Sequence, residues 1–272
     1  MSNIVLTVSV GDRPFKKFTV DSHQKYAKRI GADFKCIEDF KVDPKYNNIP
    51  LGRGGNTSYL IKLLAIQEAL EKYDRVIWLD DTCIVSSNTP NLLDIVPSEL
   101  FAAHNEGILE WVMADKQTKD LYEKNNIHNI ITSQNYFNSG VMVISKAHKS
   151  IFNSETIIDL GEAGHFKNAY PEQTYLNYMI SKYRVGFFAL PSIFNRMAVN
   201  LEEFEGERVN YETFTPMQTR LAELLENFNF LNKVNTKVGK LNGAYIYHIT
   251  SMYKPKQRFN LIKRLYEIKV SD

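Results

Sequence analysis

The chain has 272 residues, of which 44% are hydrophobic, 12% aromatic and 24% charged, a composition typical of a folded globular protein rather than a disordered one. Its formal net charge of +2 is too small to indicate a nucleic-acid-binding protein. The only two cysteines, Cys36 and Cys83, exclude a disulfide framework and give no support to a zinc site, so we expect two buried thiols.

The beginning of the chain predicts a β-α-β unit. Residues 3–10 are β-branched and mostly apolar, which is typical of a strand buried on both faces of a parallel sheet. A helix is expected over residues 20–31, with Asp21 or Ser22 as its amino-terminal cap. Residues 34–39 then return as a second strand.

The amino terminus carries no targeting signal that we can identify. It has no basic flank, and its apolar stretch is too short for a signal peptide or a membrane span. No later segment reaches the roughly 18 consecutive apolar residues that a transmembrane helix needs. We therefore expect a soluble, cytoplasmic protein without a transmembrane segment.

The next pair of elements leads to two adjacent acids. After an irregular loop, apolar residues at three- and four-residue spacing predict a helix that is opened by Asn56 or Thr57. The strand at residues 75–79 follows and ends abruptly in Asp80 and Asp81. Ligands of open α/β sheets bind beyond the carboxyl ends of strands, and this is such an end.

Two neighbouring carboxylates repel each other unless a cation or a hydrogen-bond donor lies between them. The natural partner is a hard cation that prefers oxygen ligands, such as Mg²⁺ or Mn²⁺. Asp80 and Asp81 are therefore candidate metal ligands. The alternative is that one acid caps the next turn while the other is solvated.

The remaining chain predicts one more long strand and several helices. A strand is expected at residues 135–145 and a helix around residues 150–160, and another helix begins at Pro171, a residue suited to the first helical position. Residues 202–240 are more charged and are interpreted as a helical insertion. Residues 244–270 predict a short strand, a basic loop and a terminal helix.

His248 comes directly after an apolar run near the end of the chain, and Lys254 follows six residues later. A single histidine after a strand usually belongs to the core or a turn, and a lysine in a basic loop can be a solvated surface charge. Beside a metal, however, an imidazole ligand and a lysine at a diphosphate would form one site for a phosphate leaving group.

Five segments carry the clearest motifs of the chain: WLDDTCIV, YFNSGVMVIS, PEQTYLNYMI, ALPSIFNRM and YHITSMYKP. In order and approximate spacing they resemble the family 8 glycosyltransferases, which include glycogenin and bacterial galactosyl- and glucosyltransferases. The resemblance implies a GT-A fold, an α/β architecture with a Rossmann-like, mostly parallel nucleotide-binding sheet and flanking helices. It also implies one catalytic domain over residues 1–272. The family segments are absent from residues 202–240, and we expect this helical insertion to be the acceptor subdomain.

The resemblance further implies a role for each matching residue. For the nucleotide-sugar, it implies Thr7, Val8 and Val10 in the uridine pocket, Phe15 as a stacking ring, Lys62 and Asp80 near the donor, and Lys254 at the diphosphate. For catalysis, it implies Asn138 at the donor sugar, with Glu172 and Gln173 facing the reacting anomeric carbon. For a divalent metal, it implies Asp80, Asp81 and His248.

Three positions depart from the family pattern. An ungapped match places Asp80 at the first acid of an Asp-x-Asp motif and Thr82 at the second, whereas a shift of one residue makes Asp81 the second ligand. Both alignments stay open. The family's Asp-Gln pair begins here with Glu172, and the glycine of the histidine segment is Ser251.

The resemblance implies transfer of a sugar from a nucleotide-sugar, here a UDP-sugar, to a hydroxyl of a glycan, glycoprotein or glycolipid. It implies Mn²⁺ or Mg²⁺ as cofactor and retention of the anomeric configuration. One alternative is a sugar-nucleotide nucleotidyltransferase, but the segment GDRPFKK after the first strand lacks the glycine-rich character of that class. Another is a non-catalytic carbohydrate- or nucleotide-binding protein with a degenerate site, which Thr82 would favour.

Six lysines and arginines lie among residues 254–269 and leave open a contact between the terminal helix and an anionic membrane. A solvated helix face or a contact with the diphosphate explains the same charges. No nucleic-acid partner is expected.

Overall fold

A computed structural model describes residues 1–50, 58–105, 123, 136–167, 170–197, 244–249 and 255–270. The helical insertion expected at residues 202–240 lies outside this part of the chain, and so do Lys254 and Ser251. Within the described ranges, no helix is both long enough and apolar enough to cross a membrane.

The strands form two sheets. The main sheet contains β1 (Asn3–Val8), β2 (Asp33–Ile37), β3 (Arg75–Leu79), β5 (Phe101–Asn105), β6 (Phe137–Ser145) and β7 (Phe187–Ala189). The smaller sheet contains β4 (Cys83–Val85), β8 (Arg196–Met197) and β9 (Ile246–His248). The α-helices are α1 (Lys16–Arg29), α2 (Ser58–Lys72), α3 (Leu92–Ile95), α6 (Ser154–Glu162), α7 (Pro171–Lys182) and α9 (Pro255–Lys269). Short 3₁₀ helices are η1 (Pro44–Tyr46), η3 (Lys146–Phe152) and η4 (Ser192–Phe194).

The main sheet has the strand order β2-β1-β3-β6-β5-β7. β1 pairs in parallel with β2 and β3, and β5 pairs in parallel with β7. β6 is antiparallel to both of its neighbours, β3 and β5. Only one of these six strands therefore runs against the others, which confirms the predicted α/β architecture with a mostly parallel sheet.

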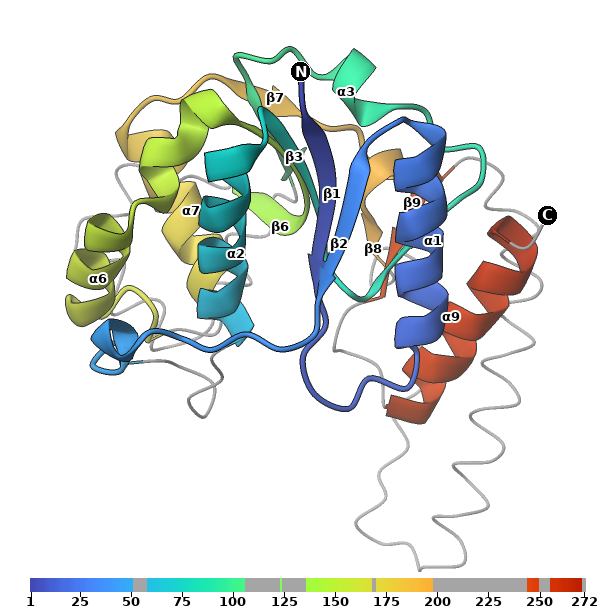
Figure 1. Cartoon of the computed structure of the whole chain (residues 1–272), viewed down its shortest axis with the longest axis horizontal. Helices are drawn as coiled ribbons and strands as arrows, with labels where there is room; N and C mark the ends of the chain where they lie inside the picture. The colour runs from blue at the N-terminus through green and yellow to red at the C-terminus, as the bar shows by residue number, and fades with distance from the viewer. Residues whose placement is uncertain are drawn as a thin grey trace, which may run out of the picture.

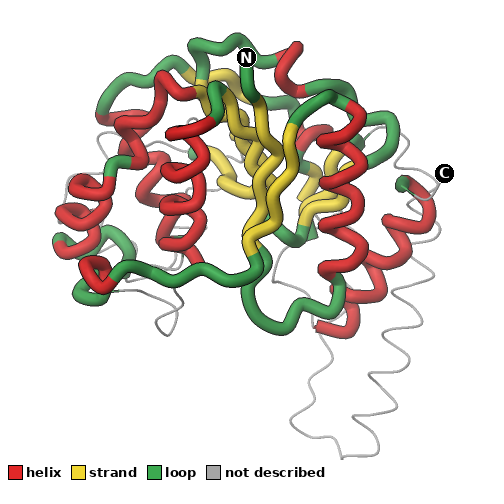
Figure 2. The backbone as a smooth tube through the Cα atoms, viewed as in Figure 1, coloured by secondary structure: helices red, strands yellow, loops and turns green. Residues whose placement is uncertain are grey.

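Helices cover both faces of this sheet (Figures 1 and 2), with α2 and α7 on one side and α1 on the other. Each face has its own apolar layer, in which α2 contributes Leu60 and Leu63 and α1 contributes Tyr26 and Ala27. β3 is buried along its whole length, as expected for a strand that is apolar at every position after Arg75.

The first helix begins earlier than predicted. α1 starts at Lys16, so Asp21 and Ser22 lie inside the helix and do not cap it, and the predicted cap is wrong. The hydroxyl of Ser22 instead donates to the carbonyl oxygen of Thr19 at 2.7 Å, one turn back in the same helix. The hydroxyl of a serine can therefore find a hydrogen-bond partner inside a helix, and the sequence alone does not distinguish such a serine from an amino-terminal cap.

The single helix expected around residues 150–160 is interrupted. η3 ends before Asn153, whose side-chain oxygen accepts from the backbone N–H groups of Glu155 and Thr156 at 2.9 and 3.3 Å. This cap starts α6 as a new helix.

The small sheet connects distant parts of the chain. β9 pairs with β4, so that His248 lies opposite Cys83, and also with β8, where its partner is Met197. Because β4 begins three residues after Asp80, this pairing brings His248 to the acidic end of β3.

His23 in α1 is fully buried and supports β4. Its Nε2 lies 2.9 Å from the carbonyl oxygen of Cys83, which can only accept, so Nε2 carries the hydrogen. Burial is the main reason that the pKa of His23 is lowered to about 4. Since an unfolded histidine has a pKa of about 6.5, the unfolded chain binds the proton first as the pH falls.

We expect this histidine to make the protein less stable in acid. The contribution of His23 to the free energy of unfolding is complete above pH 6.5 and falls by about 3 kcal/mol as the pH drops through 4. A His23→Gln variant cannot ionise there, so its deficit in unfolding free energy relative to wild type should shrink between pH 7 and pH 4. Urea unfolding of both proteins measures this gap, and two parallel curves would rule the explanation out.

Candidate functional site

The predicted site residues gather at the carboxyl ends of β1 and β3. Because β6 runs antiparallel to β3, its beginning, with Asn138 and Ser139, lies at this same end. The backbone N–H of Asp80 donates to the carbonyl oxygen of Gly140 at 2.8 Å, which joins the two strands directly beyond Leu79. The first turn of α7, with Glu172 and Gln173, contacts the same end of β6.

Lys62 of α2 lies at the centre of the site and is buried. Its Nζ lies 2.9 Å from Oδ1 of Asp80 and 3.0 Å from Oε1 of Glu172, and it also donates to the hydroxyl of Ser139 at 3.2 Å. The ammonium group stands over the ring of Trp78. Burial opposes the charged form, but the two carboxylates outweigh it and raise the pKa of Lys62, which stays protonated.

Asp80 uses its two oxygens differently. Oδ1 accepts from Lys62 and, at 2.8 Å, from Nε1 of Trp78, whereas Oδ2 lies 3.6 Å from Nε2 of His248. Burial works to raise the pKa of Asp80, but the charge of Lys62 and the hydrogen bonds from Lys62 and Trp78 hold it below its ordinary value. Asp80 is therefore an anion, and a quarter of its side chain is exposed to solvent.

His248 is buried and packs against Gly140. Burial lowers the pKa of His248 despite the opposing charge of Asp80, so the ring is neutral. A Cβ atom added to Gly140 would lie only 2.2 Å from Cε1 and 2.5 Å from Nδ1 of the imidazole. The absence of a side chain at Gly140 is what lets the ring reach this position.

Asp81 faces another group of side chains. Its Oδ2 accepts from the hydroxyl of Ser9 at 3.0 Å and lies 3.4 Å from Nε of Arg13. Burial raises the pKa of Asp81, although Arg13 and Ser9 act against this. The structure thus brings Asp80 and His248 together and holds Asp81 elsewhere.

In the ranges that the structure describes, no three histidine, cysteine or acidic side chains converge as a metal-binding group. The predicted set of three ligands is therefore not assembled around one point. Thr82, which the ungapped match puts at the second acid position, is buried, and its carbonyl oxygen accepts from the N–H of Ile249. The metal role of Asp81 stays a prediction.

A chain of amides surrounds Asn138. Its Oδ1 accepts from the backbone N–H of Gly140 and from Nδ2 of Asn195, both at 2.9 Å, and its own Nδ2 donates to Oε1 of Gln173 at 3.3 Å. The same Gln173 oxygen accepts from the backbone N–H of Ser139 at 3.2 Å. The orientations of both Asn138 and Gln173 are thereby tied to backbone donors.

Two buried polar atoms in the first turn of α7 have no hydrogen-bond partner among the described residues. They are Oε2 of Glu172, an acceptor, and Nε2 of Gln173, a donor. Buried polar groups are nearly always paired, so each such atom needs an explanation. A ligand with hydroxyl groups would supply partners for both.

The residues predicted to line the uridine pocket differ in how deeply they are buried. Thr7 is buried with an unpartnered hydroxyl oxygen, whereas Val8 and Val10 are half-buried at the end of β1. Phe15 is only 2% exposed and lies in an apolar cluster, with the guanidinium of Arg258 5.1 Å from its ring centre. This arrangement explains Phe15 as a core residue, and its stacking on a base stays a prediction.

Several residues that contact the site have no local signal in the sequence. Asn195 belongs to the matched segment ALPSIFNRM, but nothing in that pattern indicates which side chain it contacts. Ser139 lies inside an apolar strand, and Ser9 and Arg13 lie in the loop after β1. Hydrogen bonds between such distant segments have no signature in local spacing.

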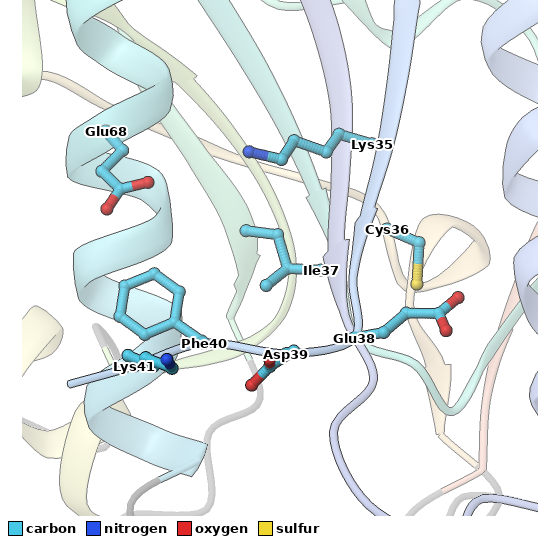
Figure 3. Close-up of a pocket in the computed structure, with 8 residues that line it drawn as sticks. All are labelled: Lys35, Cys36, Ile37, Glu38, Asp39, Phe40, Lys41 and Glu68. Atoms are coloured by element: carbon cyan, nitrogen blue, oxygen red, sulfur yellow. The ribbon is translucent and has the colours of Figure 1, made fainter.

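A separate cavity of about 300 Å³ lies beside the end of β2 and contains none of the predicted site residues. It is lined by Lys35, Cys36, Ile37, Glu38, Asp39, Phe40, Lys41 and Glu68. Figure 3 shows Lys35 pointing from β2 toward α2, which carries Glu68. Burial raises the pKa of Cys36 to about 11, although this thiol is only partly buried because β2 is an edge strand. The prediction of a buried thiol is confirmed for Cys83 alone.

Comparison with known proteins gives a family and a fold. The sequence profile described as "Glycosyl transferase family 8" matches residues 7–182. No curated protein sequence matches the chain.

Several solved structures are similar to this one. A glycosyltransferase involved in glycosylation of the major capsid of PBCV-1 is 13% identical, with 97% of this chain and 100% of that chain covered and a TM-score of 0.56. The galactosyltransferase LgtC, in complex with donor and acceptor sugar analogs, is 14% identical, with 99% and 97% covered and a TM-score of 0.57. Mouse xyloside xylosyltransferase 1 is 12% identical, with 91% and 97% covered and a TM-score of 0.50. At these identities the similarity shows the fold, which is GT-A.

Proposed function

The chain belongs to glycosyl transferase family 8 and is a glycosyltransferase, and we propose that it moves a sugar from a UDP-sugar to a hydroxyl of a glycan, glycoprotein or glycolipid. The observation that carries the proposal is that Asp80 and His248 face each other at a distance too long for a hydrogen bond. An anionic oxygen and a neutral imidazole nitrogen face each other across 3.6 Å at the end of the central strand.

This pair fits a divalent cation. Two atoms bound to one cation at about 2.1 Å lie about 3 Å apart at a right angle and further apart at wider angles, so 3.6 Å leaves room for an ion between them. Mg²⁺ is commonly held by one or two protein groups together with substrate phosphates and water. We propose Asp80 and His248 as the ligands of Mn²⁺ or Mg²⁺. Asp81 can be a third ligand only if its carboxylate breaks its ion pair with Arg13.

When bound, the metal would offset the negative charge that grows on the diphosphate as the bond to the sugar breaks. The chain's own residues prepare the sugar side of the site. Lys62 fixes Glu172 through Oε1, which leaves Oε2 to accept from a sugar hydroxyl or to face the positive anomeric centre. Nε2 of Gln173 is the neighbouring donor, and Asn138 holds that side chain in place.

Other parts of the proposal rest on the sequence. These are the UDP group, retention of the anomeric configuration, the diphosphate contact of Lys254, the choice of acceptor by residues 202–240, the cytoplasmic location and a contact of the terminal helix with a membrane. They stay predictions.

Turnover with a panel of donors tests the function. The protein is incubated with UDP-, GDP- and dTDP-sugars and Mn²⁺, with and without a chelator, and release of the nucleoside diphosphate is measured. We expect release from a UDP-sugar that stops when the metal is removed. An Asp80→Asn variant should lose this activity, while Asp159→Asn, on the exposed face of α6, should keep it. Absence of binding and turnover with every donor would refute the proposal.

A further inference from the structure

Asn195 is a fully buried side chain to which the proposed reaction assigns no role. It follows η4 and immediately precedes β8, the strand that pairs with β9 beside His248. Its amide lies between two site residues that are far away in the sequence. Nδ2 is 2.9 Å from Oδ1 of Asn138, and Oδ1 is 3.1 Å from Nδ1 of His248.

The direction of these hydrogen bonds is set by the backbone. The N–H of Gly140 can only donate, and its acceptor is Oδ1 of Asn138. The other end of the Asn138 amide agrees, because Nδ2 donates to an oxygen of Gln173 that also accepts from the backbone N–H of Ser139. Asn138 therefore presents an acceptor to Asn195.

This acceptor fixes Asn195 in turn. Only the amide nitrogen of Asn195 can donate to Asn138, so the amide oxygen must face His248. An amide oxygen accepts, and His248 must consequently carry its hydrogen on Nδ1. A histidine that binds a cation is neutral, and in that form its other nitrogen, Nε2, holds the lone pair.

The lone pair points at an anion. Nε2 of His248 lies 3.6 Å from Oδ2 of Asp80, which is longer than a hydrogen bond, and a cation between the two atoms would give both of them a partner. In the opposite tautomer, Nε2–H would donate to Asp80 and close the gap, while Asn195 would face a lone pair.

We propose that Asn195 is a positioning residue that holds His248 as its Nδ1–H tautomer, so that Nε2 is available to a divalent cation. The inference rests on the proposed function for its purpose but not for its test. Outer hydrogen-bond partners of ligating histidines typically change metal affinity or activity by 10–100-fold. Asn195 would be such a partner.

The tautomer is measured first on the wild-type protein without metal or donor. Nitrogen-15 NMR of the histidine rings distinguishes a protonated Nδ1 from a protonated Nε2, and a His248→Gln variant identifies the signals of His248. We expect the hydrogen on Nδ1. A hydrogen on Nε2 would overturn the proposal, whether or not the enzyme transfers sugar.

An Asn195→Leu variant removes the acceptor. We expect His248 to switch to the Nε2–H tautomer and the affinity for Mn²⁺ in the presence of UDP to fall by about 10–100-fold. The matched control is Asn177→Leu, which also replaces a fully buried asparagine but one that is bonded to the backbone of Phe137 and Gln173. It should lower stability and leave the tautomer unchanged. An unaltered tautomer in folded Asn195→Leu would refute the proposal.

Discussion

Gly140→Ala is expected to lower the rate of glycosyl transfer by at least about 100-fold. The added methyl group would stand 2.2 Å from Cε1 of His248 and 2.9 Å from Oδ1 of Asn138. The backbone of Gly140 cannot retreat easily, because it lies in a central strand and accepts from the N–H of Asp80. The imidazole must move instead, and a misplacement of about 1 Å in an active site can cost about 100-fold in rate.

The effect on stability should be smaller than the effect on rate. Overpacking of a core typically costs about 1–3 kcal/mol, so the variant should fold. The matched control is Gly161→Ala in α6, where the added Cβ would lie 2.8 Å from Cγ2 of Ile49. This control should be destabilised to a similar extent while keeping its kcat. If Gly140→Ala kept at least half of the wild-type kcat, His248 would not be needed in its observed position.

Lys62→Met is expected to lower the free energy of unfolding by about 3–5 kcal/mol. Methionine has a similar length, but the substitution removes the cation that lies between Asp80 and Glu172 and leaves two carboxylates in a buried site. Removing one partner of a buried ion pair costs this much because the remaining charge stays desolvated. Urea unfolding with a constant slope would measure the loss.

An exposed lysine provides the comparison. Lys149 lies 2.7 Å from Glu71, a closer contact than either ion pair of Lys62, but the side chains of Lys149 and Glu71 are each about half exposed. Surface pairs contribute about 0–1 kcal/mol, so Lys149→Met should change stability by no more than this. The double variant Lys62→Met with Glu172→Gln should recover part of the loss. Equal effects for Lys62 and Lys149 would show that burial does not determine the strength of these pairs.

The sequence predicts the parts of the fold whose residues carry a local signal. The strand at residues 75–79 is apolar after Arg75 and is fully buried, and Pro171 begins α7 as expected. β6 was also expected, but its reversed direction was not. An apolar strand has the same pattern in both directions, so its orientation depends on how the chain returns to the sheet. The strands of the small sheet are only two or three residues long and show no period.

The same distinction applies to the site. The family motifs predict Asp80, Asn138, Glu172 and His248 in one region, and the structure brings these side chains together through Lys62 and Asn195. It also shows that Asp81 faces Arg13, which adjacency to Asp80 did not indicate. Asn195 acts through two hydrogen bonds to residues more than 50 positions away. Such contacts depend on the pairing of β8 with β9, and no local pattern records that pairing.

The reversed direction of β6 has a consequence for how this enzyme can diverge. In most enzymes the residues around the substrate lie on loops, which accept substitutions and insertions readily. Here three residues of the proposed site, Asn138, Ser139 and Gly140, are consecutive in a strand buried inside the sheet. Selection for a new sugar can alter them only by disturbing the core. The variation that separates this protein from its relatives in donor or acceptor choice should therefore accumulate on the loops that face β6, while β6 itself changes slowly.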